Sequence, residues 1–379
     1  MFGSGGGALI AKALGEQNRK KADSLFSTVY VLAIGLGITL SLLGQLTLPY
    51  TVRLLGAEGE MMTQGMQYAR ITLMFIPAVM LQYVNQYMLP TAEKARLGMS
   101  ITIFAGVVNI LLVVLFVAVF RWGVTGAAMA NGIGQCMGGF LPLFWFASKK
   151  NDGLLHFIKP EFHMREIVQM SVNGSSEFVT NLSSYLIGIL FNFQLMRFIG
   201  EDGVAIFGVI MYINMIFISV FTGYSIGVGP VVGYNNGAGN HLELKNILKK
   251  SLVMIGGSGV ILMALAMLLS SPLAFLYVGY DEILWDSTTI AFRIYSSSFL
   301  IMGMNIFGSA FFTSLNNGLI SALISFLRTL LFQACAVMLL PVFFGETGIW
   351  FSVFAAEALT LIVTVVCLIT NKNKYHYFA

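Results

Sequence analysis

The stretch LGMSITIFAGVVNILLVVLFVAVF, residues 97–120, contains no charged side chain. A helix needs roughly 20 consecutive apolar residues to cross the hydrocarbon core of a bilayer, and this stretch is long enough. Strands of membrane barrels instead alternate apolar and polar residues over about 10 positions, and residues 97–120 show no such alternation. The stretch therefore predicts a transmembrane helix.

The same kind of segment recurs along the whole chain. Uncharged runs occupy residues 25–52, 71–92, 124–148, 203–240, 251–280 and 294–327. Three further apolar runs carry one or two charges each: residues 167–199 with Glu177 and Arg197, residues 319–344 with Arg328, and residues 349–370 with Glu357. We predict ten full spans and a short apolar segment at the amino terminus, and therefore an all-α polytopic membrane protein.

Composition excludes the main alternatives. Hydrophobic residues make up 57% of the 379 residues and charged residues 10%, against about 25% charged residues in soluble proteins. Mean hydropathy is +0.82. The three cysteines, Cys136, Cys335 and Cys367, lie in apolar runs, which argues against a disulfide framework. Neither an HExxH nor a CxxC motif occurs, and we expect neither an enzyme nor a bound cofactor.

Charged residues in the loops predict the orientation. Of the 21 lysines and arginines, 15 fall in one alternate set of loops: Lys12 to Lys21, Lys94 and Arg96, Lys149 to Arg165, Lys245 to Lys250, and Lys372 and Lys374. The intervening loops are acidic, with Glu58, Glu60, Glu201, Asp202, Asp281, Glu282, Asp286 and Glu346. The positive-inside rule places the basic loops and the carboxyl terminus in the cytoplasm of a cell-membrane protein. The net charge of +4 then reflects topology, and we expect no nucleic-acid partner.

Two pairs of similar segments indicate an internal repeat. Residues 14–21, LGEQNRKK, resemble residues 238–245, AGNHLELK, with their glycines 224 positions apart. Residues 122–126, WGVTG, resemble residues 344–348, FGETG, with their glycines 222 positions apart. Both halves run in the same direction, so we predict a parallel repeat about the membrane normal. The predicted lobes are residues 1–160, including the linker, and residues 161–379.

The two predicted lobes are unequal. In the second, Gly239 lies 74 positions after Arg165, whereas in the first 14 residues precede Gly15. The residues before Gly15 are too few to cross a bilayer. We therefore expect the first lobe to lack its first helix and part of its second, relative to an architecture of six plus six helices.

The order of these motifs resembles a known family. The first lobe of multidrug and toxic compound extrusion (MATE) transporters is similar to the series Leu14-Gly15, a basic loop, Pro90, Gly98, Asn109 and Gly123-Val124-Thr125-Gly126-Ala127-Ala128. The second-lobe signature of that family is similar to residues 230–239, PVVGYNNGAG, which form the most specific motif. The family's bacterial multidrug-export branch is similar to the later series Arg328, Leu340-Pro341, Gly348-Ile349-Trp350 and Glu357.

This resemblance implies two six-helix lobes around a central cavity, and antiport of organic compounds, often cationic, against protons or sodium ions. The chain departs from the family at two acidic positions. The place four residues after Asn109 is Val113, and the tenth-helix aspartate of sodium-coupled relatives falls near Met304 and Asn305. The coupling ion is therefore left open.

Glu177 is the strongest candidate for ion coupling. A charged side chain inside a membrane span costs roughly 2.5 to 3.5 kcal/mol on insertion scales, so it is retained where it faces a cavity or a partner. Asn181 follows four residues later, on the same helical face, where it can ligate a cation or hold the carboxyl group. The resemblance adds that the family carries an ion-binding glutamate at the matching place.

Other polar residues within the apolar runs form a second set of candidates. Arg328 and Glu357 can pair across neighbouring helices, either for coupling or as a structural pair that fixes helix packing. Asn109 is expected to form an interhelical hydrogen bond rather than a substrate contact. Gln86 in the first lobe, and Tyr212 and Asn214 in the second, are either cavity-lining residues or interhelical contacts.

The leading interpretation is a monomeric multidrug efflux antiporter, with small drug-like compounds and the lipid bilayer as its partners. A flippase for lipids or lipid-linked oligosaccharides is the alternative transporter. It is disfavoured because a pyrophosphate group calls for several arginines and Arg328 alone lies deep in a span here. A truncated remnant without transport activity is the third possibility.

Overall fold

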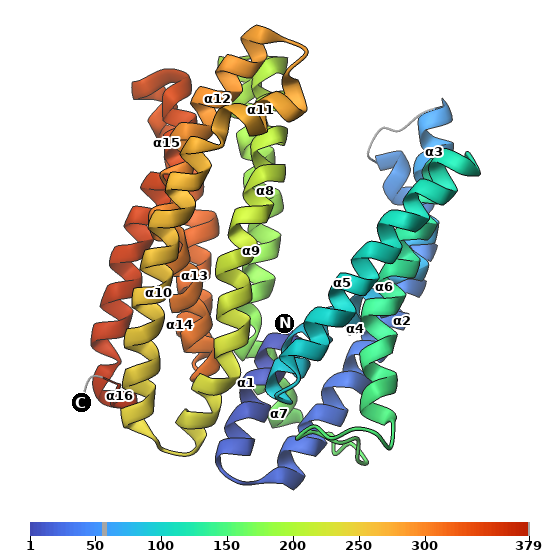
Figure 1. The fold of residues 1–379 in the computed structure, drawn as a ribbon, viewed down its shortest axis with the longest axis vertical. Coiled ribbons are helices and arrows are strands. Elements are labelled where there is room, and N and C mark those ends of the chain that lie inside the picture. Colours follow the sequence, from blue (N-terminus) through green and yellow to red (C-terminus); the bar gives the residue numbers. More distant parts are fainter. Residues whose placement is uncertain (55–58, 378–379) are drawn as a thin grey trace. The chain divides into compact units, whose positions relative to one another are not determined.

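The computed structural model describes residues 1–54 and 59–377, which form two compact units (Figure 1). The N-terminal unit comprises residues 2–168, and the C-terminal unit comprises residues from Gln169 onward together with Met1. The division lies eight residues beyond the predicted lobe boundary, inside helix α7 (Met164–Asn173). Glu58, one of the acidic loop residues, lies outside the described residues.

The N-terminal unit is a bundle of helices. These are α1 (Phe2–Gly15), α2 (Arg19–Leu54), α3 (Gly59–Met74), α4 (Ile76–Thr91), α5 (Ala95–Val113), the π-helix η1 (Val114–Val119) and α6 (Gly123–Ala147). The glycines of α1 let it approach α2 closely, as small residues do between membrane helices. A Cβ atom on Gly6 would lie 2.6 Å from Cγ2 of Val29.

The linker after α6 is held against the start of α2. The backbone amides of His156 and Ile158 donate to Oδ1 of Asp23 at 2.8 Å and to Oγ of Ser27 at 3.0 Å. The Phe157 ring packs on Phe26, with ring centroids 4.8 Å apart. Because these bonds satisfy backbone groups that have no helical partner, the linker is fixed to the N-terminal unit.

The C-terminal unit is a larger bundle. After α7 it contains α8 (Ser175–Phe198), α9 (Glu201–Gly237), α10 (His241–Leu268), α11 (Ser270–Val278), α12 (Glu282–Ser296), α13 (Phe299–Ser314), α14 (Gly318–Phe326), the π-helix η2 (Leu327–Leu331), α15 (Phe332–Thr370) and α16 (Lys372–Tyr375). Its core gathers large apolar side chains from α8, α9, α12, α13 and α15. The turn between α9 and α10 lies at the same end as α16, and the turn between α11 and α12 lies at the opposite end (Figure 1).

The described residues confirm an all-helical membrane protein, with several spans broken. Six continuous helical segments are long and apolar enough to cross a membrane, or seven if α12 and α13, bent by 48°, count as one span. The last of the six, Gly318–Thr370, is itself divided at Gly345, where φ is 59° and ψ is −142°. Of the ten predicted spans, residues 71–92 are divided between α3 and α4, and residues 124–148 form the glycine-rich α6.

Left-handed turns recur at the spacing predicted for the repeat. Positive φ angles occur at Gln17 and Gly239, which are 222 residues apart, and at Gly123 and Gly345, which are also 222 apart. Between them, Glu93 and Asn316 are 223 residues apart and also have positive φ. Glycine adopts this conformation without steric cost, which explains why the WG and FG motifs mark the third pair of turns. The common spacing supports the predicted internal repeat.

Carboxamide side chains support helices where proline removes a hydrogen bond. Pro341 has no N–H, so the carbonyl of Val337 loses its helical donor, and Nε2 of Gln194 in α8 donates to that oxygen at 3.3 Å. In the N-terminal unit Pro142 likewise leaves the carbonyl of Gly138 without a helical donor, and Nδ2 of Asn85 donates to that oxygen at 3.1 Å. Each bond joins the proline-containing helix to its neighbour.

Candidate functional site

The C-terminal unit contains a cavity of about 280 Å³. Side chains from α8, α9, α12, α13, η2 and α15 line it. Its polar lining residues are Ser184, Asn214, Arg328, Thr329, Gln333 and Glu357. The remaining walls are mainly apolar and aromatic, including Phe191, Phe207, Met211, Tyr295 and Met302. A concave, largely apolar site with a few polar groups is typical of small-molecule binding.

A buried ion pair borders the cavity. Nε of Arg328 lies 2.8 Å from Oε1 of Glu357, and the two side chains are 12% and 4% exposed. The other carboxylate oxygen, Oε2, accepts a hydrogen bond of 2.7 Å from Nδ2 of Asn305 in α13. Thr364 in turn donates to Oδ1 of Asn305 at 3.0 Å. The predicted pairing of Arg328 with Glu357 is therefore present, within a network that fixes both side chains.

Local helix geometry places Arg328 in this network. The residue lies in the π-helix η2, which follows α14 directly. A π-helical turn is wider than an α-helical one and is frequent at functional sites. Sequence analysis considered Asn305 only as a departure from the family's aspartate position and missed its contact with Glu357. A polar amide within the uncharged run 294–327 was the available signal.

Asn214 and Tyr212 lie on different faces of α9. Asn214 lines the cavity, and its buried Oδ1 accepts no hydrogen bond from the described part of the protein. Tyr212 is 65% exposed, does not line this cavity, and stacks on Tyr277 with ring centroids 6.3 Å apart. The structure thus brings one of these two candidates to the cavity and places the other outside it.

Glu177 lies in the first turn of α8. The apolar run 167–199 is divided at Gly174 between α7 and α8, so this residue follows a break in the helix. The Gly-Ser-Ser sequence that precedes it has low helix propensity, which explains the break. Nδ2 of Asn181 donates to the backbone carbonyl of Glu177 at 2.8 Å. The amide nitrogen of Asn181 is thus engaged with the backbone of Glu177.

Asn109 and Gln86 are the candidate residues of the N-terminal unit, and their surroundings differ. Nδ2 of Asn109 donates to Oδ1 of Asn131 at 2.9 Å, which joins α5 to α6 as expected. Gln86 is exposed on α4. Neither residue lines the cavity described above.

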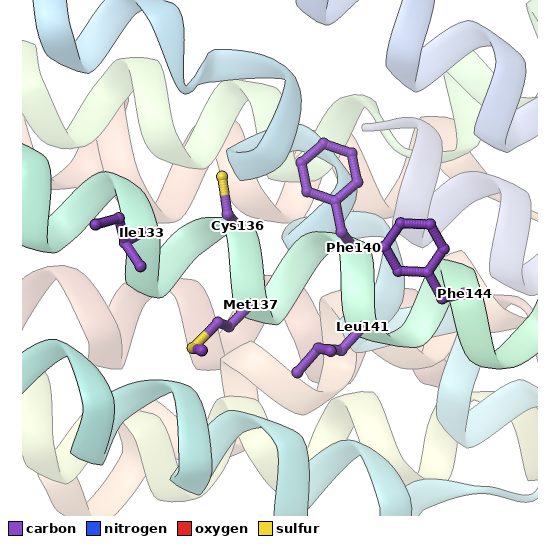
Figure 2. A pocket seen from close by; sticks show the side chains of 6 residues that line it. All are labelled: Ile133, Cys136, Met137, Phe140, Leu141 and Phe144. Atoms are coloured by element: carbon purple, nitrogen blue, oxygen red, sulfur yellow. The ribbon is translucent and has the colours of Figure 1, made fainter.

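A second pocket, apolar and about 390 Å³ in volume, lies along α6 in the N-terminal unit (Figure 2). All its lining side chains come from this helix: Ile133, Cys136, Met137, Phe140, Leu141 and Phe144. Their spacing of three and four residues forms one helical face. Figure 2 shows Cys136 and Met137 pointing to opposite sides of that face. The pocket offers an apolar surface without polar groups to orient a ligand.

Comparison with known proteins identifies the family. The MatE family model matches residues 1–115 and 178–338. The multidrug export protein MepA of Staphylococcus haemolyticus (strain JCSC1435) is 23% identical over 389 residues, which cover 99% of this chain and 82% of that protein. MepA of Staphylococcus aureus (strain NCTC 8325 / PS 47) is 22% identical over 383 residues, with the same coverage of both chains.

Solved structures show the same fold. A MATE transporter crystallised in complex with MaL6 is similar with a TM-score of 0.91 and 20% identity, covering 99% of this chain and 84% of that one. The outward-facing conformation of a multidrug resistance MATE family transporter of the MOP superfamily is similar with the same TM-score, identity and coverage. The family model matches well over half of the chain, and the fold agrees with it. The chain therefore belongs to the MatE family of membrane transporters.

Proposed function

We propose that this protein is a multidrug efflux transporter, a secondary antiporter that exports organic, often cationic, compounds in exchange for protons or sodium ions. The family match over residues 1–115 and 178–338 is the observation that carries the proposal. The name of the MepA relatives, multidrug export protein, supports the direction and the breadth of transport.

The cavity of the C-terminal unit supports a drug-like cargo. Its aromatic and methionine side chains offer an adaptable apolar surface, which suits substrates of varied shape. Arg328 is the one basic residue among its lining side chains. A single guanidinium that is already paired with Glu357 is poorly suited to a pyrophosphate group, so this cavity favours drug efflux over lipid-linked oligosaccharide transport.

Glu177 is our proposed coupling carboxylate. Both carboxylate oxygens of Glu357 are engaged by Arg328 and Asn305, which leaves that residue less suited to exchange an ion. Glu177 is half-buried in the first turn of α8. The ionised carboxylate of such a residue can balance the charge of a bound cation in the apolar surroundings of a membrane span.

The proposed orientation has the carboxyl terminus and the linker of residues 149–165 in the cytoplasm. Lys245, Lys249 and Lys250 follow the turn between α9 and α10, at the end of the C-terminal unit where α16 also lies (Figure 1). Asp281 and Glu282 lie at the opposite end, in the turn between α11 and α12. This separation of charge supports the orientation.

A resistance and dye-efflux assay in a pump-deficient bacterium tests the function. Cells that express the protein should extrude ethidium and tolerate higher concentrations of cationic drugs than cells with an empty vector. Varying external sodium and pH independently identifies the coupling ion. Membrane expression without efflux at any sodium concentration or pH would contradict the proposal.

A further inference from the structure

Arg328 presents unused hydrogen-bond donors to the cavity of the C-terminal unit. A guanidinium carries five N–H donors, and Glu357 engages it through Nε. Among the described residues, 1–54 and 59–377, no hydrogen bond to the terminal Nη groups of Arg328 is present. These two groups form the end of the planar fork that binds a carboxylate through two parallel hydrogen bonds.

Both carboxylate oxygens of Glu357 are already engaged. Its oxygens accept from Arg328 and from Asn305, and its side chain is 4% exposed against 12% for Arg328. The carboxylate thus fixes the guanidinium. Both groups line the cavity, but the oxygens of Glu357 already accept hydrogen bonds, so the N–H groups that Arg328 has left are the donors that a ligand can meet at this wall.

Asn214 supplies a hydrogen-bond acceptor, in contrast to the donors of Arg328. Its Oδ1 is buried and accepts no hydrogen bond from any described residue. A buried carbonyl oxygen without a donor costs free energy, and a ligand that carries an N–H group would satisfy it. Asn214 lines the same cavity as Arg328, so one ligand can meet both groups.

The walls between these polar groups are aromatic. The Phe191 and Phe207 rings stack with centroids 4.8 Å apart and an interplanar angle of 7°, and both line the cavity together with Met211 and Met302. The volume of about 280 Å³ corresponds to roughly nine water molecules at about 30 Å³ each. It fits a small aromatic compound.

We propose that this cavity binds a small aromatic zwitterion, with its carboxylate on the Nη groups of Arg328 and its ammonium group on Oδ1 of Asn214. Arg328 and Glu357 together carry no net charge, and a zwitterion adds none, so the occupied site would stay neutral. The proposal names a substrate class for the proposed transporter and rests on that function only in treating the ligand as cargo.

Binding of three related probes to the purified protein tests the ligand class. Phenylalanine carries both charges, phenylalaninamide lacks the carboxylate, and 3-phenylpropionate lacks the ammonium group. Phenylalanine should bind at least about tenfold more tightly than either analogue, because each lost charge-assisted hydrogen bond costs about that factor. Equal binding of phenylalaninamide, or no phenylalanine binding in the millimolar range, would overturn the proposal.

Variants locate the binding site. Arg328→Met combined with Glu357→Leu removes both charges without leaving a buried carboxylate unpaired, and Asn214→Leu removes the acceptor. Each should weaken phenylalanine binding at least about tenfold while the protein stays monodisperse in gel filtration. Arg197→Lys is the control, because Arg197 is exposed near the end of α8 and does not line the cavity. Unchanged binding in the double variant would place the ligand elsewhere.

The proposed efflux function and the proposed binding site can be contradicted independently of each other. If cells show no ethidium efflux but the purified protein binds phenylalanine through Arg328 and Asn214, the efflux function is wrong and the binding site stands. If efflux is normal and phenylalanine binding is absent, the site assignment is wrong and the efflux function stands.

Discussion

At the scale of single residues, the buried pair of Arg328 and Glu357 affects the stability of the folded protein. Removing one partner leaves a buried charge without compensation, which typically costs about 3–5 kcal/mol, whereas replacing both with apolar side chains is often neutral. Arg328→Met alone should therefore lower the melting temperature of the purified protein markedly. Adding Glu357→Leu should restore most of the loss. A double variant less stable than either single variant would contradict this account.

Glu177 gives a second prediction at the residue scale. Glu177→Gln keeps the shape of the side chain and removes its titratable charge, so it should abolish cation-driven ethidium efflux while membrane expression stays normal. Glu357→Gln should reduce efflux less, because the carboxylate oxygens of Glu357 already serve Arg328 and Asn305. Efflux rates of the two variants and the wild type, measured across pH and sodium concentration, test this prediction. Wild-type transport by Glu177→Gln would make the Arg328–Glu357 pair the better candidate.

At the scale of elements, Gln194 compensates for the proline in α15. Gln194→Leu should destabilise the protein by about 1–3 kcal/mol, because it leaves the buried carbonyl of Val337 without a donor. Pro341→Ala supplies the missing helical N–H, so in the double variant the loss should be smaller than in Gln194→Leu alone. Thermal melts of the two single variants and the double variant measure this coupling.

Asn85 provides a control for the double-variant experiment on Gln194 and Pro341. It donates to the carbonyls of Gly138 and Gly139 at 3.1 and 2.8 Å and accepts from the hydroxyl of Tyr30. Pro341→Ala should leave the effect of Asn85→Leu unchanged, since Asn85 supports α6 and not α15. Coupling between those two changes would show that the rescue is not specific to Val337.

For the whole molecule, the distribution of charged loops predicts one orientation in the membrane. In a background with the three native cysteines replaced by serine, Lys150→Cys should resist a membrane-impermeant maleimide in intact cells and react after permeabilisation. Tyr280→Cys, which is 83% exposed between α11 and α12, should react in intact cells. Labelling of position 150 from outside would reverse the topology.

The sequence alone determined the helical membrane class and the family, because long apolar runs and the PVVGYNNGAG motif are visible without a structure. It also singled out Arg328 and Glu357, since a charge inside an apolar run is costly wherever that helix packs. It could not decide which polar residues meet. Asn305 joins Glu357 through a bond that spans 52 residues of sequence, and no local pattern encodes that distance.

Only the tertiary structure decided which face of each helix lines a cavity. Tyr212 and Asn214 are two positions apart and therefore lie on different faces of α9, yet both are polar residues in one uncharged run. In a soluble protein the apolar stripe of a helix shows which side is buried. Lipid tails are as apolar as a protein interior, so both faces of a membrane helix are apolar and the hydrophobic pattern carries no such direction.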